Sequence, residues 1–127
     1  MSFKALIVAA VSAAFFGSIQ VYAAPASDSA QTYYGDATSY YPDGGLGACG
    51  APSQNTDLVV ALSADQYDGG ANCWRHIGVH YQGHFVDATV VDLCPGCASG
   101  SIDLSPAAFE QLAPLSAGRI QVSWDYE

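Results

Sequence analysis

The chain has 127 residues, with twelve acidic and three basic side chains and a formal net charge of −9 at pH 7. So few cations cannot displace counterions from a phosphate backbone, which argues against nucleic acids and anionic membranes as partners. The length suits one small domain, and the four cysteines suggest that disulfides supplement a modest core.

Residues 1–23 are predicted to form a secretory signal peptide. Lys4 supplies a short positive segment, residues 5–16 are apolar, and Ala23 closes a cleavage site of small residues. The apolar stretch is too short for a transmembrane helix. We therefore expect a secreted, extracellular protein that is not membrane-bound after cleavage, with residues 24–31 as a loose leader. Two arginines would then face twelve acids, a net charge of −10.

Short strands and glycine-rich loops alternate through the next part of the chain. Residues 32–41 are aromatic and β-branched, which predicts a strand with a kink or bulge at Gly35. Residues 42–56 are rich in glycine and proline and predict a long loop. Residues 57–61 predict a second, short strand, followed by one helical turn capped by Ser63.

A β-hairpin gives the clearest local pattern. Residues 76–81 and 84–91 alternate on either side of Gln82 and Gly83, where glycine can supply a positive φ. The sequence Cys-Pro-Gly-Cys follows at residues 94–97. We therefore expect two antiparallel strands, the second of which ends at a tight turn.

The last part of the chain predicts a short helix and a closing strand. Within residues 103–112, Ser105 is a suitable N-cap and Pro106 a suitable first helical residue. Residues 118–124 alternate again. Many short strands with one or two small helices in a single domain indicate an all-β barrel or sandwich.

Four cysteines in a secreted chain are expected to form two disulfides. Spacing favours Cys94 with Cys97 across the Pro-Gly turn, which leaves Cys49 with Cys73. The crossed pairing, Cys49 with Cys94 and Cys73 with Cys97, remains open. An oxidising compartment argues against a zinc site, so no metal and no other cofactor is expected.

Asp92 is the first candidate for a functional residue. A β-branched strand delivers its carboxylate to the strand end beside a locked turn, which is a way to present an acid to a groove. The structural alternative is a strand-end carboxylate that only caps the turn. His76 and His80 share a strand face, but their spacing is too long for a tight metal pair.

An ordered set of motifs then resembles a known family. The motifs are Thr38-x-Tyr40, Gly47-Ala-Cys-Gly50, Ala61-Leu-Ser63, Cys73 before the hairpin, Val90-Val-Asp92-x-Cys94 and Asp103-Leu-Ser-Pro-Ala-Ala-Phe109. They resemble the double-psi β-barrel group, which includes expansin catalytic-type domains, barwin, kiwellin and rare-lipoprotein-A-like proteins. Among these, the chain is most similar to small single-domain fungal expansin-like proteins of the loosenin type.

The resemblance implies a closed six-stranded double-psi β-barrel over residues 32–127, with two disulfides and an open groove. It supports the pairing of Cys49 with Cys73. It also implies a secreted monomer that binds and loosens cell-wall polysaccharide, such as cellulose, chitin or a related glucan.

Family positions carry over residue by residue. Asp92 falls where the resemblance places the essential acid, and Thr38 and Tyr40 fall on the groove-lining motif. Asp103 is interpreted as mainly structural. Tyr41 and Trp74 are further candidates for stacking on sugar rings.

Hydrolysis is disfavoured because an inverting glycosidase needs both an acid and a base. In the family 45 glycoside hydrolases, the base occupies the position of Pro42 in this chain. Asp43, one residue further, is a conditional base, and a displaced base costs catalysis heavily. A non-hydrolytic, expansin-like function is therefore favoured, with a weak family 45-like endoglucanase as an alternative.

Two other activities occur on the same barrel. Lytic transglycosylases carry a histidine where this chain has residues 65–67, and an Arg-Gly-Pro where it has residues 93–95, so that activity is disfavoured. A secreted protease inhibitor or plant–microbe interaction protein, acting through its loops on a protein partner, remains an alternative.

Overall fold

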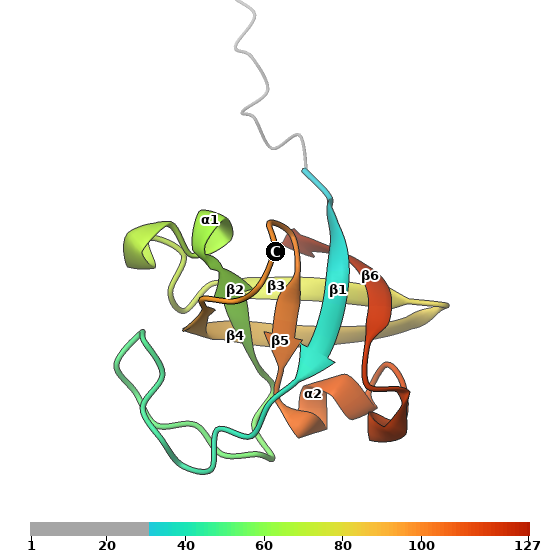
Figure 1. Cartoon of the computed structure of the whole chain (residues 1–127), viewed down its shortest axis with the longest axis horizontal. Helices are drawn as coiled ribbons and strands as arrows, with labels where there is room; N and C mark the ends of the chain where they lie inside the picture. Colours follow the sequence, from blue (N-terminus) through green and yellow to red (C-terminus); the bar gives the residue numbers. More distant parts are fainter. Residues whose placement is uncertain (1–30) are drawn as a thin grey trace, which may run out of the picture.

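Six strands close into a barrel with the order β1-β5-β2-β4-β3-β6 (Figure 1). The computed structural model describes residues 31–127, so the predicted signal peptide and nearly all of the leader lie outside the described residues. The strands are β1 (Tyr33–Ser39), β2 (Val59–Ser63), β3 (His76–Tyr81), β4 (His84–Cys94), β5 (Ile102–Leu104) and β6 (Ile120–Tyr126). The predicted all-β, six-stranded barrel is confirmed.

Between residues 31 and 127, helical structure is limited to short pieces. The α-helices are α1 (Ala64–Tyr67) and α2 (Pro106–Glu110), and the 3-10 turns are η1 (Asp68–Gly70) and η2 (Leu115–Ala117). Ser105 caps α2 as predicted, because its side chain accepts a hydrogen bond from the Ala108 N–H. Ser63 stands at the N-cap of α1, but its hydroxyl bonds the Gln66 side chain instead of a backbone N–H. Within residues 31–127, no helix is long and apolar enough to cross a bilayer.

The predicted hairpin forms with the expected register. Tyr81 pairs with His84 across the turn, and Gln82 and Gly83 both have positive φ. β1 pairs with β5 and β2 pairs with β4 in parallel, while the other neighbours are antiparallel. The two parallel pairs bring residues far apart in sequence onto adjacent strands.

The strand predictions were wrong about β5 and about a bulge at Gly35. The sequence patterns missed β5, because three residues are too few to display alternation. Gly35 is not a bulge, since β1 pairs with β6 in unbroken register from Tyr33 to Ala37. A Cβ at Gly35 would lie 2.4 Å from the Gly100 carbonyl oxygen, so glycine is needed there for a close backbone approach.

The barrel interior is filled by the inward residues of every strand and by α2. Trp124 is fully buried, stacks on Tyr33 at 4.4 Å between ring centroids, and donates its indole N–H to the Gly100 carbonyl at 2.8 Å. Phe109 of α2 is also fully buried. This packed interior leaves the outer face and the loops to present polar side chains.

Both disulfides form as the spacing favoured and the resemblance implied. Cys49 is bonded to Cys73, and Cys94 is bonded to Cys97. The first bond ties the long loop after β1 to the segment before β3. In Figure 1 this loop projects from the barrel on the side where β4 ends.

Candidate functional site

A row of paired residues crosses four adjacent strands on the outer face of the barrel. Thr38 pairs with Asp103, Asp103 pairs with Ala61, and Ala61 pairs with Asp92. Asp103 and Ala61 each lie between two core residues of their strand, and Ala37 before Thr38 also belongs to the core, so these three members of the row point outward. The small Ala61 side chain therefore separates two carboxylates that lie two strand spacings apart.

A β-bulge turns Asp92 to the outer face. In β4, Val86, Ala88 and Val90 all belong to the core, so strict alternation would direct residue 92 inward as well. The register with β2 shifts after Val90, so that Asp92 instead of Val91 pairs with Ala61. The extra residue reverses the alternation and exposes the carboxylate.

Asp92 is held by backbone donors. Its Oδ1 accepts from the Ala48 N–H and from its own neighbour, the Leu93 N–H, each at 2.8 Å. Because both bonds use one oxygen, Oδ2 remains the oxygen that can accept a bond from a ligand. Asp92 lines a pocket of about 200 Å³ together with Tyr40, Tyr41 and other loop residues.

Asp103 is the second carboxylate of the row. The Thr38 hydroxyl donates to its Oδ1 at 3.1 Å. Partial burial, reinforced by the negative charge of Asp92, raises the pKa of Asp103, although the Thr38 bond and Arg119 act in the opposite direction. Asp103 was predicted from the sequence to be mainly structural, whereas it lies beside the predicted groove residues Thr38 and Tyr40.

Tyr40 completes this group. Burial, followed by the charges of Asp92 and Asp103, raises the pKa of its phenol above the ordinary value. The phenol therefore stays protonated and can act as a hydrogen-bond donor beside two carboxylates. We call Thr38, Tyr40, Asp92 and Asp103 the acidic row.

The remaining predicted site residues lie around the acidic row. Tyr41 is 60% exposed and lines the pocket of Asp92. Asp43, the conditional base, exchanges two hydrogen bonds with Asn55 in the loop and is not among the residues that line this pocket.

Trp74 lies in a second, adjoining pocket. It is 49% exposed and lines an open pocket of about 530 Å³ together with Leu58. This pocket shares Ser53 and Val91 with the pocket of Asp92, so the two form a continuous depression. Aromatic faces are therefore present along the depression, beside the polar row.

This arrangement suits a polyhydroxylated ligand. Carboxylate oxygens accept hydrogen bonds from hydroxyl groups, the Tyr40 phenol donates one, and Tyr41 and Trp74 offer apolar faces. The depression is open, as a site for a polymer must be.

Comparison with known proteins places the chain in a family. A family profile described as lytic transglycolase, of the double-psi β-barrel type, matches residues 34–124. The chain therefore belongs to this family, and it is an expansin-like double-psi β-barrel protein.

Individual relatives agree with this assignment. The papain inhibitor of Streptomyces mobaraensis is 38% identical over 96 residues, which cover 69% of this chain and 67% of the inhibitor. An aspartate-to-asparagine mutant of the Clavibacter michiganensis expansin, solved in complex with cellohexaose, superposes with a TM-score of 0.70 at 32% identity. The match covers 76% of this chain and 50% of the expansin, so this chain spans half of it. The Streptomyces papain inhibitor structure superposes with a TM-score of 0.68 at 34% identity and covers 76% of this chain and 94% of the inhibitor.

Proposed function

We propose that this chain is a secreted, non-hydrolytic, expansin-like protein that binds and loosens cell-wall polysaccharide through the acidic row. The observation that carries the proposal is the alignment of Thr38, Asp103 and Asp92 across strands β1, β5, β2 and β4, with the Tyr40 phenol beside them. The expansin bound to cellohexaose supports a β-glucan as the ligand.

The two carboxylates have different parts in this proposal. Asp92 is a fixed acceptor for sugar hydroxyls, because backbone N–H groups orient it. Asp103 is a carboxylate whose pKa is raised above the ordinary value, because it is half-buried and lies near the charge of Asp92. Their contacts replace hydrogen bonds between neighbouring glycan chains, and no bond in the polysaccharide is cleaved.

The experiment measures binding and loosening in parallel with hydrolysis. Purified protein is incubated with insoluble cellulose and with chitin, and the bound fraction, the loss of mechanical strength of filter paper and the release of reducing sugars are recorded. We expect binding and weakening without sustained sugar release. Asp92→Asn and Asp103→Asn should each abolish weakening.

A matched control distinguishes the effect of the acidic row from the effect of removing one negative charge elsewhere. Asp65→Asn removes one exposed acid in α1 and should behave as the unchanged protein. Sustained release of reducing sugar that disappears in Asp92→Asn would show that the protein is a glycosidase instead. Weakening that survives both row variants would refute the role of the row.

Protease inhibition is the second candidate function, because the papain inhibitor relatives match most of both chains. Tyr41 and Leu46, which is 74% exposed, stand on the long loop as contacts for a protein partner. Titration of papain activity tests this candidate. An inhibitor acting through this loop should lose potency in Leu46→Ser and be indifferent to Asp103→Asn.

A further inference from the structure

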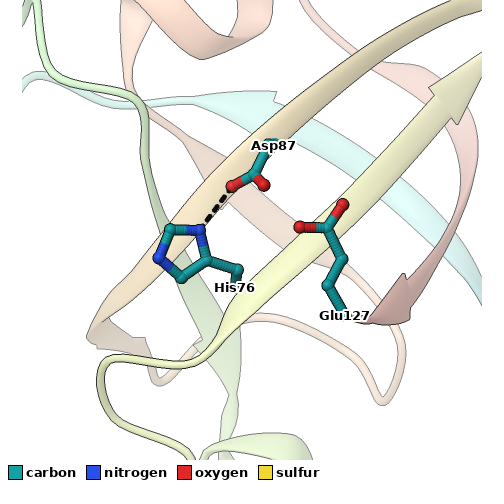
Figure 2. Close-up of side chains that lie close together, drawn as sticks. All are labelled: His76, Asp87 and Glu127. Atoms are coloured by element: carbon teal, nitrogen blue, oxygen red, sulfur yellow. Dashed lines mark hydrogen bonds and ion pairs between the residues drawn. The ribbon is translucent and has the colours of Figure 1, made fainter.

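Three ionisable side chains meet on another part of the outer face. Figure 2 shows His76 of β3, Asp87 of β4 and Glu127, which follows β6, pointing toward one another. His76 Nδ1 lies 2.6 Å from Asp87 Oδ1, and one ligand atom from each of the three residues lies within 4.8 Å of the others. The backbone N–H of Glu127 donates to the His76 carbonyl at 3.0 Å, which fixes its position. We call these three residues the His76 cluster.

The protein provides little positive charge to this cluster. Within residues 31–127, Arg75 and Arg119 are the only lysine or arginine residues. Arg75 packs over an aromatic ring and Arg119 pairs with Asp36. Neither arginine is therefore paired with Asp87 or Glu127. A divalent cation would neutralise both carboxylates at once.

Gly78 lets the Glu127 side chain lie close to the β3 backbone. Gly78 pairs with Asp87 on one side and with Asp125 on the other. A Cβ at Gly78 would lie 3.0 Å from Glu127 Oε1 and 2.8 Å from the Phe85 ring. A side chain at this position would therefore displace the Glu127 carboxylate from the cluster. His76 and Asp87 also line the open 530 Å³ pocket, so ions from solvent can reach the cluster.

We propose that His76, Asp87 and Glu127 bind one divalent transition-metal ion, with Zn²⁺ as the best match. One imidazole nitrogen and two carboxylate oxygens form a ligand set that Zn²⁺ accepts, with water in the fourth position. The imidazole disfavours Mg²⁺ and Ca²⁺, which prefer ligand sets made of oxygen. The spacing of His76 and His80 within one strand does not reveal this site, because the partners of His76 lie on β4 and after β6.

For the pair of His76 and Asp87, the geometry needs only a small adjustment. Two tetrahedral ligands at about 2.1 Å from zinc lie roughly 3.4 Å apart. His76 Nδ1 and Asp87 Oδ1, now 2.6 Å apart, must therefore separate by about 0.8 Å. Both side chains are partly exposed, so rotation can supply this shift. Bound zinc would connect β3, β4 and the residue after β6, and would stabilise the folded barrel by mass action.

Calorimetric titration with ZnCl₂ tests the proposal on protein treated with EDTA and dialysed. We expect one site with a micromolar Kd, no comparable response to MgCl₂, and a rise in Tm of several degrees at about ten times the Kd. Glu127→Gln and His76→Gln should each weaken binding at least about tenfold, because each removes one of three ligands. Circular dichroism would verify that both variants remain folded.

Matched controls locate the site. His84→Gln removes an exposed histidine of the same hairpin, and Asp65→Asn removes a distant acid; both should retain the full affinity. His80 Nε2 lies 3.8 Å from Asp125 Oδ1 and is the competing location. Loss of binding in His80→Gln alone, retention of affinity in Glu127→Gln, or no heat and no Tm shift would each overturn the proposal. This inference does not depend on polysaccharide binding, which has a separate assay.

Discussion

Removal of the Cys49–Cys73 disulfide should lower stability more than removal of the Cys94–Cys97 disulfide. The two bonds close loops of sequence separation 24 and 3. The chain-entropy relation then gives a stabilisation of about 3.5 kcal/mol for the first and about 1.6 kcal/mol for the second. The difference of about 2 kcal/mol corresponds to roughly 8 to 15 °C in Tm for a domain of this size.

The assay compares the double variants C49A/C73A and C94A/C97A by thermal circular dichroism. Both replace two half-buried sulfur atoms with alanine, so the loop length is the main difference. Equal losses of Tm, or a larger loss for C94A/C97A, would refute the entropic reasoning.

The Cys49–Cys73 disulfide should also affect ligand binding. Cys49 is next to Ala48, whose N–H holds Asp92 Oδ1 at 2.8 Å. A loop freed from Cys73 would hold this donor less firmly, so C49A/C73A should bind cellulose more weakly even well below its Tm. If C49A/C73A is folded and binds cellulose as tightly as the unchanged protein, the tethered loop does not control ligand binding by Asp92.

Three further predictions concern single residues. Ser105→Ala should cost about 2–3 kcal/mol in urea unfolding, because the buried hydroxyl caps α2 and bonds the Asp57 carbonyl, whereas exposed Ser116→Ala should be near neutral. Gly47→Ala should cost about 1–3 kcal/mol, because the added Cβ would lie 2.3 Å from a carbonyl oxygen; Gly96→Ala, in open space, should change the unfolding free energy by less than about 0.5 kcal/mol. Because the pKa of Asp103 is raised, the folded protein binds a proton at this residue more tightly than the unfolded chain does. The contribution of this proton to stability is therefore lost as pH rises through the pKa of the folded state. The Tm of Asp103→Asn should therefore rise relative to that of the unchanged protein as pH increases above about 4, the ordinary pKa of an aspartate, and a difference in Tm that does not change with pH would contradict the assignment.

Local patterns predicted the elements that depend on neighbouring residues. The hairpin followed from a glycine turn between alternating segments, and α2 followed from Ser105 and Pro106. Both signals act over a few residues, so the sequence displays them directly. The predicted second strand began two residues early, because Asp57 lies in the loop that hydrogen-bonds with Ser105.

Contacts between strands that are far apart in the sequence could not be predicted from local patterns. The Thr38–Asp103 contact joins residues 65 positions apart through a parallel strand pair. No local pattern distinguishes this Asp103 from a structural turn residue. For the His76 cluster, the hairpin register alone would have placed Asp87 diagonally opposite His76. Glu127 could be added only once β6 was known to pair with β3.

The bulge in β4 explains why the disulfide, the long loop and Asp92 form one unit. An extra residue leaves backbone groups without ladder partners, and here the loops satisfy them. The Cys49 N–H donates to the Val91 carbonyl at 3.0 Å, and the Trp74 N–H donates to the Val90 carbonyl at 2.8 Å. The Cys49–Cys73 bond thus fixes both donor segments beside the bulge. Since the bulge is what turns Asp92 outward, the disulfide acts on the orientation of this carboxylate as well as on the stability of the barrel.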